Sequence, residues 1–458
     1  MNKRLLITLF LGVLLAAMDI AILGPVLPAL RHEFGATTRD SSWLITAYVL
    51  ANLVGTPLLG RLSDRKGRRF VYTLSLSIFA LGSLGVVFAP QLAGLILARA
   101  IQGFGSGGIF PVASAVIGDV VAHDKRGRAL GLLGATFGLA FLVGPPIGGM
   151  ILAFAGWRWI FAINLPFALI VMILAWRVLP SKGRDTRKPF DFAGLATFSG
   201  GLVLVAAGLS ALAPNLPYMG LDAPHLWIPL LVGALLLSMT PRIERAAEDP
   251  LVPPFMLAPG LVRNVLLLGL GAGLGEVAVM LLPDLAVQAL GVTPAKGSFL
   301  LVPLVLGLTI AAPISGRLLD RIGARPILLV GVLLQALSMG AFLLFPTTRL
   351  LYFVAGPVLG AGLACLLAGP LRWLLLRHVD SDQRTGAQSL LSLSHSVGQI
   401  VTAALLGALA TSFGIHGTAN GLRLALGVGG AFSLSLLIPT FGIPKREQDE
   451  SLVDSLAP

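Results

Sequence analysis

Charge is what this sequence has least of. Only 12% of its 458 residues are Asp, Glu, Lys or Arg, whereas a soluble globular protein carries about 25%. Hydrophobic residues make up 56% of the chain. Such a chain has too few polar side chains to cover a surface that faces water. The composition therefore excludes a soluble enzyme and a nucleic-acid-binding protein, and it indicates a protein of the lipid bilayer.

Cysteine and histidine are also scarce. The single cysteine, Cys365, excludes a disulfide within the chain and a cysteine metal site. The six histidines show no HExxH or similar spacing, and no GxxxxGK(S/T) nucleotide-binding loop occurs. An enzyme acting inside the membrane would need clustered nucleophiles, bases or metal ligands, which the sequence does not offer. We therefore expect no enzyme activity, no catalytic residues, no metal, no cofactor and no ATP-driven pumping.

Long apolar runs are abundant. A helix needs about 20 apolar residues to cross the roughly 30 Å hydrocarbon core, and the chain contains about fourteen such runs. We therefore predict an all-α integral membrane protein. The runs begin near Leu5, Trp43, Phe70, Leu92, Ala129, Ile160, Phe192, Leu226, Val265, Ser298, Pro326, Leu350, Ala387 and Leu422.

The net charge of +12 is a sign of topology rather than of an anionic partner. Basic residues gather in alternate connecting segments, which hold about 26 of the 33 Lys and Arg residues and which the positive-inside rule assigns to the cytoplasm. An even number of spans then places both termini in the cytoplasm. The predicted location is a bacterial-type inner (plasma) membrane.

An internal repeat divides the chain. GRLSDRKGRR at 60–69 and GRLLDRIGAR at 316–325 share Gly, Arg, Leu, Asp, Arg, Gly and Arg at matching positions. Duplicated bundles related by an axis along the membrane normal are a transporter architecture, with the binding site at the midplane between them. We predict a six-helix bundle at 1–180, linkers with two inserted helices at 181–264, a second six-helix bundle at 265–443 and a cytoplasmic tail at 444–458.

The repeated segment is a candidate gate. We expect a loop in which glycines allow a tight turn and the acidic residue pairs with a basic neighbour or with a helix N-terminus. Such contacts can form in one conformation and break in another. Alternatively, the basic residues only anchor the loop to anionic headgroups. The gate residues are Gly60, Arg61, Asp64, Arg65, Gly67 and Arg68, with Asp320 and Arg321 in the second copy.

Five further segments follow one another in a characteristic order: DSSWLITAYVL (40–50), LARAIQGFGSGG (97–108), GATFGLAFLVGPPIGGMI (134–151), GWRWIFAINLP (156–166) and LPDLAVQALGVTPAKGSFLLVP (282–303). Together with the repeat, they resemble the major facilitator superfamily, specifically its fourteen-helix drug:proton antiporter branch of multidrug and tetracycline-type efflux pumps. The resemblance covers nearly the whole chain. It implies the major facilitator fold, with two helices inserted between two six-helix bundles, and export by exchange.

The segment at 134–151 resembles the antiporter motif of the fifth helix. Its glycines allow close approach to another helix and its prolines introduce a kink. Static packing and a rocking hinge between the two bundles would both use these residues, so the sequence leaves both interpretations open. The motif residues are Gly134, Gly138, Gly144, Pro145, Gly148 and Gly149.

Carboxylates inside the apolar runs are candidates for proton or substrate binding, because an ionised group at mid-bilayer costs about 2.5–3.5 kcal/mol on insertion scales. Asp19 and Glu276 lie near mid-depth in the first helix of each half. Asp284 lies on the same predicted face as Glu276, towards the outer surface. We expect this face to line a wet cavity in which protons and cations compete for one carboxylate. The alternative is that neighbouring polar groups satisfy these carboxylates.

Other polar residues in the spans are candidates as well. Arg99 would pair with a carboxylate or extend to the headgroups, and Gln102 continues its face. His395 would relay protons or form part of a hydrogen-bonded seam between helices. It belongs to a stripe of Gln388, Ser392, His395, Gln399 and Thr402.

The sequence therefore predicts a proton-coupled secondary antiporter that exports small hydrophobic or cationic compounds by alternating access. Its predicted partners are its substrate, protons and the lipid bilayer, and not nucleic acid. The resemblance to the major facilitator superfamily implies that it acts as a monomer. The alternative is an exporter of lipids or amphiphilic metabolites with the same fold, and an intramembrane enzyme is disfavoured.

Overall fold

The computed structural model describes residues 3–36, 38–181, 191–210, 224–248, 260–379, 383–412 and 419–445. All the regular secondary structure in these ranges is helical. A backbone in lipid must satisfy its own N–H and C=O groups, and a helix does so within a single segment. The all-α prediction is confirmed.

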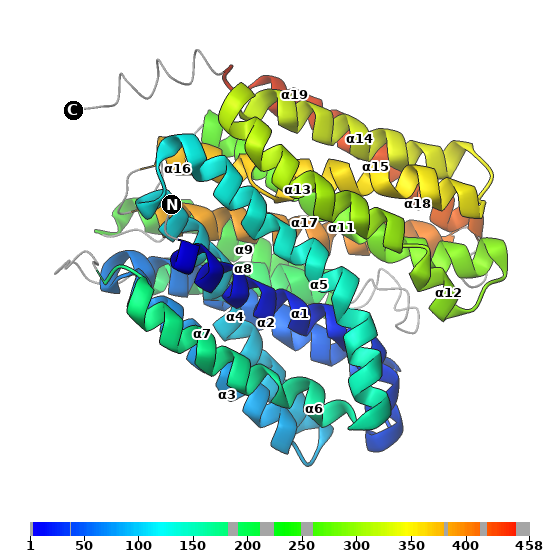
Figure 1. The fold of residues 1–458 in the computed structure, drawn as a ribbon, viewed down its shortest axis with the longest axis horizontal. Helices are drawn as coiled ribbons and strands as arrows, with labels where there is room; N and C mark the ends of the chain where they lie inside the picture. The colour runs from blue at the N-terminus through cyan, green and yellow to red at the C-terminus, as the bar shows by residue number, and fades with distance from the viewer. Residues whose placement is uncertain are drawn as a thin grey trace.

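The first half of the chain forms a bundle whose helices pack mainly on one another (Figure 1). Within it, α4 packs along both α2 and α3, and α1 packs along α5. Its elements are α1 (Lys3–Phe34), α2 (Thr38–Lys66), α3 (Arg68–Phe88), α4 (Leu92–Val120), the short η1 (His123–Lys125), α5 (Arg126–Phe154), α6 (Trp157–Ala162) and α7 (Asn164–Val178).

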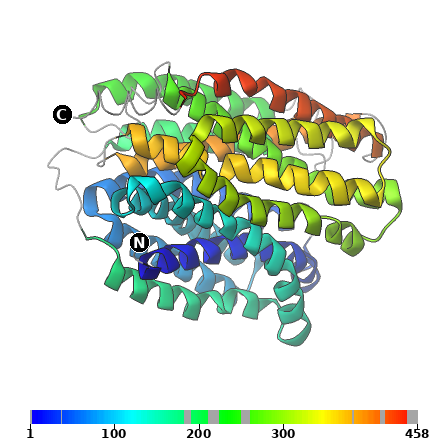
Figure 2. The same ribbon diagram turned by 45° about the horizontal axis from the view of Figure 1, so that its top comes forward.

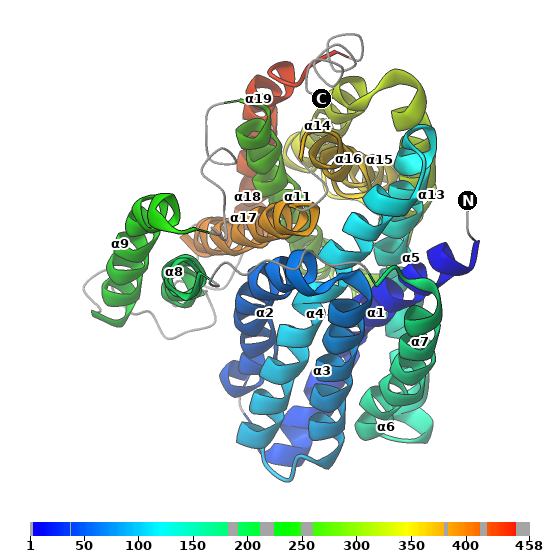
Figure 3. The same cartoon turned by 90° about the vertical axis from the view of Figure 1, so that its left-hand side faces the viewer.

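The second half forms a matching bundle, in which several spans consist of two consecutive helices. Its elements are α11 (Leu261–Leu290), α12 (Pro294–Phe299), α13 (Val302–Ile322), α14 (Ala324–Leu344), α15 (Arg349–Leu367), α16 (Pro370–His378), α17 (Arg384–Ser412), α18 (Ala419–Ser435) and α19 (Leu437–Phe441). Between the two bundles in sequence come α8 (Phe192–Ser210) and α9 (Pro224–Ala246). Figure 3 shows this pair beside α2 and α17, and α8 contacts both of those helices.

Twelve segments of the described chain are long and apolar enough to cross a membrane. The shorter apolar part of α8, Phe192–Gly208, and the more polar α17 bring the number close to the fourteen predicted. In Figure 2, α1 begins and α19 ends towards the same end of the molecule. We call it the basic end, because the Arg-rich junction of α2 and α3 lies there.

The two bundles meet through α5 with α13 and through α2 with α17. The largest apolar core joins them near the basic end, with fully buried side chains from both halves, among them Ile117, Leu130, Leu319 and Leu375. Apolar contact across both halves closes this end of the molecule.

The expectation of a loop at 60–69 is wrong. Helix α2 continues to Lys66 and α3 begins at Arg68, so only Gly67 leaves the helical conformation. Its φ of 98°, like the φ of 81° at Gly323 in the second copy, is a conformation that favours glycine. One glycine is enough to reverse the chain, and the charged residues before it therefore lie on the last turns of α2 and α13.

Candidate transport site and gate

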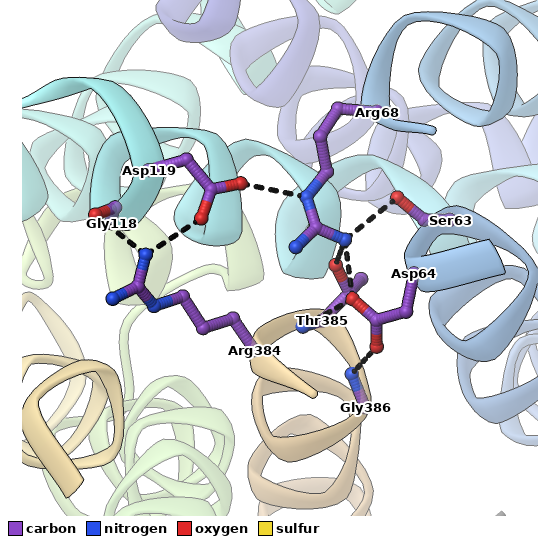
Figure 4. Close-up of polar contacts among 8 residues, drawn as sticks. All are labelled: Ser63, Asp64, Arg68, Gly118, Asp119, Arg384, Thr385 and Gly386. Carbon is purple, nitrogen blue, oxygen red and sulfur yellow. Dashed lines mark hydrogen bonds and ion pairs between the residues drawn. The ribbon is translucent and has the colours of Figure 1, made fainter. Parts of the chain in front are cut away.

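Asp64, at the end of α2, caps the first turn of α17 in the other bundle (Figure 4). Its carboxylate accepts hydrogen bonds from the backbone N–H of Thr385 at 3.2 Å and of Gly386 at 2.9 Å. The first N–H groups of a helix have no partner within the helix and carry the positive end of its dipole, so they favour a carboxylate. Asp64 therefore holds the two bundles together at the basic end.

Arg68 extends this contact into a charged cluster. It pairs with Asp64, and its Nε donates to Asp119 of α4 at 2.9 Å. Arg384, at the start of α17, donates to the other oxygen of Asp119 at 2.8 Å. Figure 4 shows the guanidinium groups on either side of Asp119. We call the contacts of Asp64, Arg68, Asp119 and Arg384 the first latch.

The second copy of the repeat forms a second latch, in which a carboxylate of the second half caps a helix of the first half. Asp320, at the end of α13, accepts hydrogen bonds from the backbone N–H of Gly127 at 2.7 Å and of Arg128 at 2.9 Å. These groups belong to the first turn of α5. Each half thus contributes one carboxylate that caps a helix of the other half, and both latches lie at the basic end.

The remaining gate residues differ in their surroundings. Gly60 is needed for close approach and not for a turn, because an added Cβ would lie 2.0 Å from the hydroxyl of Ser389 on α17. Arg61 is buried on α2, Arg65 is half-buried, and Arg321 is exposed on α13.

The glycines of the 134–151 segment serve two contacts. A Cβ at Gly134 would lie 2.3 Å from the Cα of Ala368, and one at Gly138 would lie 2.4 Å from Thr309, so both lie at the contact with the second half. Gly144 and Gly148 instead approach α1 within their own bundle, where an added Cβ at either position would lie 2.9 Å from a side chain of α1. An added Cβ at Gly149 would meet open space. The side chain of Pro145 lies outside the described part of the structure.

Asp19 and Arg99 form an ion pair deep in the first bundle. Nη1 of Arg99 lies 2.6 Å from Asp19 Oδ2, and the two side chains are each 1% exposed. The guanidinium also lies 4.4 Å from the ring centre of Tyr48. Each partner here compensates the charge of the other, which a buried charge requires.

Amides complete the coordination of Asp19. Gln102 donates to Asp19 Oδ1 at 2.8 Å and Asn164 donates to the same atom at 3.0 Å, and Gln102 also donates to Ser83 at 2.8 Å. Sequence reasoning did not single out Asn164, although it lies in the family-like segment GWRWIFAINLP. Asp19 is closed off from solvent in this conformation. This agrees with the alternative interpretation, in which neighbouring polar groups satisfy the carboxylate.

Glu276, by contrast, lies in a partly open cluster between α11 and α17. Its carboxylate accepts a hydrogen bond from Gln399, and Nε2 of His395 lies 3.5 Å from Oε2 of Glu276. The side chains of Glu276 and His395 are 25% and 22% exposed. Close packing brings them together, since a Cβ at Gly273 would lie 2.3 Å from the carbonyl oxygen of His395. The structure thus brings Glu276 of α11 to His395 and Gln399, which lie one turn apart on α17 and more than a hundred residues further along the chain.

Asp284 does not join this cluster. It is exposed near the far end of α11 and makes no hydrogen bond or ion pair with another described residue. That Asp284 and Glu276 line one face of a cavity therefore stays a prediction. In this structure Asp284 is exposed and Glu276 is a quarter exposed.

Arg372 was missed by the sequence reasoning, which counted it as a cytoplasmic marker. It is 7% exposed on α16 and donates to Gln388 at 3.1 Å and to Ser392 at 3.2 Å. The sequence did offer a signal for this site. Arg372 lies inside the apolar run GPLRWLLL, and the next predicted helix carries Gln388 and Ser392 one turn apart.

Two duplicated helical bundles, latched at one end and carrying ionisable side chains at depth, define a membrane transporter and not an enzyme. The comparisons agree. The family model described as Major Facilitator Superfamily matches residues 9–281 and 265–454. The chain belongs to the major facilitator superfamily.

Relatives and solved structures extend this result. An uncharacterized transporter of this superfamily from Bacillus subtilis, YfiU, is 32% identical over 87% of this chain and 78% of its own length. A multidrug resistance protein B homolog of Mycobacterium tuberculosis is 30% identical over 88% of the chain and 75% of its own length. The proton:xylose symporter XylE matches with a TM-score of 0.68 at 16% identity over 98% of both chains, which supports the fold alone.

Proposed function

We propose that this protein is a proton-coupled antiporter that exports hydrophobic or cationic compounds across a bacterial plasma membrane by alternating access. The observation that carries the proposal is the cluster of Glu276, His395 and Gln399. It places a carboxylate on α11 and an imidazole on α17 3.5 Å apart and partly open, and α17 packs against α2 and α4 of the first bundle. The multidrug transporters among the relatives support the choice of cargo.

Glu276 can serve as the exchange site because one carboxylate cannot hold a proton and a cation at once. When it is ionised, it attracts a lipophilic cation that would be costly to leave alone in a low-dielectric interior. Protonation removes this attraction and releases the cargo. Nε2 of His395, at 3.5 Å from Oε2 of Glu276, is close enough to pass a proton to that carboxylate.

The two latches supply the alternation. Both are formed here, so the basic end is closed and cargo would leave at the opposite end. Proton entry then returns the carrier, and each charge crossing the membrane gains about 2.3 kcal/mol per 100 mV. By the positive-inside rule the basic end would be cytoplasmic, so the end at which cargo leaves in this cycle would face the outside.

An exporter of amphiphiles is the second candidate. It is favoured by an apolar groove of about 650 Å³ beside α5, α6 and α7, lined among others by Met150, Phe154, Trp159 and Ile163. A groove of this kind on the outside of the bundle would accept an acyl chain. Transport of a lipid-like probe without a cation charge would favour this second candidate.

The test is efflux in proteoliposomes with an imposed pH gradient or an imposed sodium gradient, with ethidium as the cationic probe. We expect the pH gradient to drive transport by the wild type, and Glu276→Gln to abolish that drive while the protein still reconstitutes. The matched control is Glu33→Gln, which removes a carboxylate that lies beyond the membrane-spanning part of α1 and pairs with Arg158. Unchanged proton drive in Glu276→Gln would exclude Glu276 as the coupling residue.

A further inference from the structure

Arg372 is a buried cation whose partners are all neutral. Its guanidinium donates to the amide oxygen of Gln388 and the hydroxyl of Ser392, and it lies 3.9 Å from the ring centre of Phe110. No carboxylate of the described residues pairs with it. The side chain is nevertheless only 7% exposed.

Two other buried arginines, unlike Arg372, have carboxylate partners. Arg99 pairs with Asp19, and Arg68 pairs with Asp64 and Asp119. Such pairing is expected, because a guanidinium keeps its charge in proteins and a buried charge without a counterion is costly. The surroundings of Arg372 are therefore short of one negative charge, and a ligand can supply it.

Arg372 also lies where the two bundles meet. Gln388 and Ser392 belong to α17 of the second half, whereas Phe110 belongs to α4 of the first half and stacks edge-on against Phe137 of α5 at 5.2 Å. The first latch holds α17 by its first turn, one turn before Gln388. If the latch opens and the first half moves away, Phe110 leaves the guanidinium and exposes it to the basic end.

We propose that Arg372 binds the anionic group of an amphiphilic cargo, a carboxylate or a sulfonate, when the basic end opens. Gln388 and Ser392 hold the guanidinium fork in place for a charge-assisted contact, and the rings of Phe110 and Phe137 offer an apolar surface to the rest of the molecule. The inference rests on the proposed transport function and widens its cargo to organic anions.

The anion site and the proton site lie on one helix at different depths. From Gln388 to Gln399, α17 rises about 16 Å, so an anion on Arg372 does not compete with a proton on Glu276. An anionic probe and a cationic probe should therefore respond to different substitutions, the first to changes at Arg372 and the second to changes at Glu276.

The experiment is proteoliposome transport of anilinonaphthalene sulfonate as the anionic probe and of ethidium as the cationic probe, under the same pH gradient. Wild type should transport both. Arg372→Gln should lower transport of the anionic probe by about tenfold or more, the effect expected for one lost charge-assisted hydrogen bond, and leave ethidium transport within about twofold. Arg372→Lys should retain part of the anion transport, because it keeps the charge without the planar fork.

Arg423 provides the matched control. Its guanidinium likewise donates to neutral groups, here backbone carbonyl oxygens with Leu343 at 2.7 Å among them, and it lies at the opposite end of the second bundle. Arg423→Gln should leave the ratio of anionic to cationic transport unchanged. Each measurement is made in phosphatidylcholine vesicles with and without phosphatidylglycerol.

The possible outcomes separate the two proposals. Wild-type transport of ethidium without transport of the sulfonate would overturn the anion site and leave the proposed function intact, whereas transport of neither probe would overturn the proposed function. Equal loss of both probes in Arg372→Gln would show that the arginine only supports the fold. An effect of Arg372→Gln confined to vesicles with phosphatidylglycerol would assign it to a lipid headgroup instead of cargo, which also contradicts the proposal.

Discussion

The first helix of each half carries a carboxylate at depth, but the two have different surroundings. In α1, Asp19 has an arginine and two amides around it and its side chain is 1% exposed. In α11, Glu276 has one amide and one imidazole, and a quarter of its side chain is open. The two halves thus hold one carboxylate that is closed off by polar partners and one that stays partly open.

The latches show a second difference between the halves. Asp64 binds helix N–H groups and also Arg68, which reaches a further carboxylate. Asp320, in the second half, accepts hydrogen bonds from helix N–H groups and forms no ion pair with a basic side chain among the described residues. Ala324 stands in the repeat at the position of Arg68. The first latch is therefore a charged network, and the second is a simple helix cap.

The largest expected effect concerns the two carboxylates. Asp19→Asn leaves Arg99 buried without a counterion, so it should lower the free energy of unfolding by about 3–5 kcal/mol. Glu276→Gln removes a partly exposed group and should cost less than about 1 kcal/mol. Thermal unfolding in detergent measures both. Similar losses in the two variants would remove the distinction between a structural and an exchanging carboxylate.

The first latch should stabilise the closed basic end more than the second latch does. Asp64→Asn should favour opening of the basic end by about 1–3 kcal/mol, because it removes charged hydrogen bonds, and Asp320→Asn should do so by less. The measurement is labelling of Ser389→Cys by a maleimide, after replacement of Cys365, since Ser389 is buried beneath α2. Greater labelling in Asp320→Asn than in Asp64→Asn would reverse the proposed ranking.

Two glycines of α5 test whether close contact between the halves matters. A Cβ at Gly134 meets the backbone of the second half, whereas one at Gly149 meets nothing within 4 Å. Gly134→Ala should therefore destabilise the closed basic end by about 1–3 kcal/mol, and Gly149→Ala should be neutral or slightly stabilising. Equal transport rates and equal labelling of Ser389→Cys in the two variants would show that α5 tolerates a wider spacing.

The smallest effect is expected at an exposed ion pair, formed by Glu33 beyond the spanning part of α1 and Arg158 at the start of the span Trp157–Val178. A hydrogen bond from Trp157, supported by Arg158, lowers the pKa of Glu33. A carboxyl group with a lowered pKa adds stability above its ordinary pKa of about 4.3 and loses it as the pH falls through the lowered value. Glu33→Gln should thus be slightly less stable than wild type at neutral pH and equally stable well below pH 4. A difference that persists in acid would point to packing instead.

The helices and the two halves could be predicted because lipid leaves the chain few alternatives. Apolar length defines a span, and the repeated Gly, Asp and Arg residues show the duplication without any knowledge of contacts. The local shape of the gate was harder to predict. The glycine at 67 indicated a turn, but helical hydrogen bonds extend up to it on both sides, so the expected loop became two helix ends.

The candidate site was only partly predictable, because its pairs join residues distant in sequence. That Asp64 would meet a helix N-terminus follows from electrostatics, but the identity of α17 as that helix depends on the packing of the two bundles. Arg372 looks like a topology marker by position, and it is buried because α16 packs against α17 and α4. Asp284 looks like a neighbour of Glu276 by spacing, yet its side chain is exposed.

Both latches end on backbone amides at helix starts, and this choice affects the speed of the carrier. When the halves separate, each freed amide lies at the water-facing margin of the bilayer and can be rehydrated at once. An ion pair buried between the halves at mid-depth would instead leave two bare charges in hydrocarbon each time it broke. In the proposed cycle, fastening the halves at their wet rim would thus keep the opening barrier low.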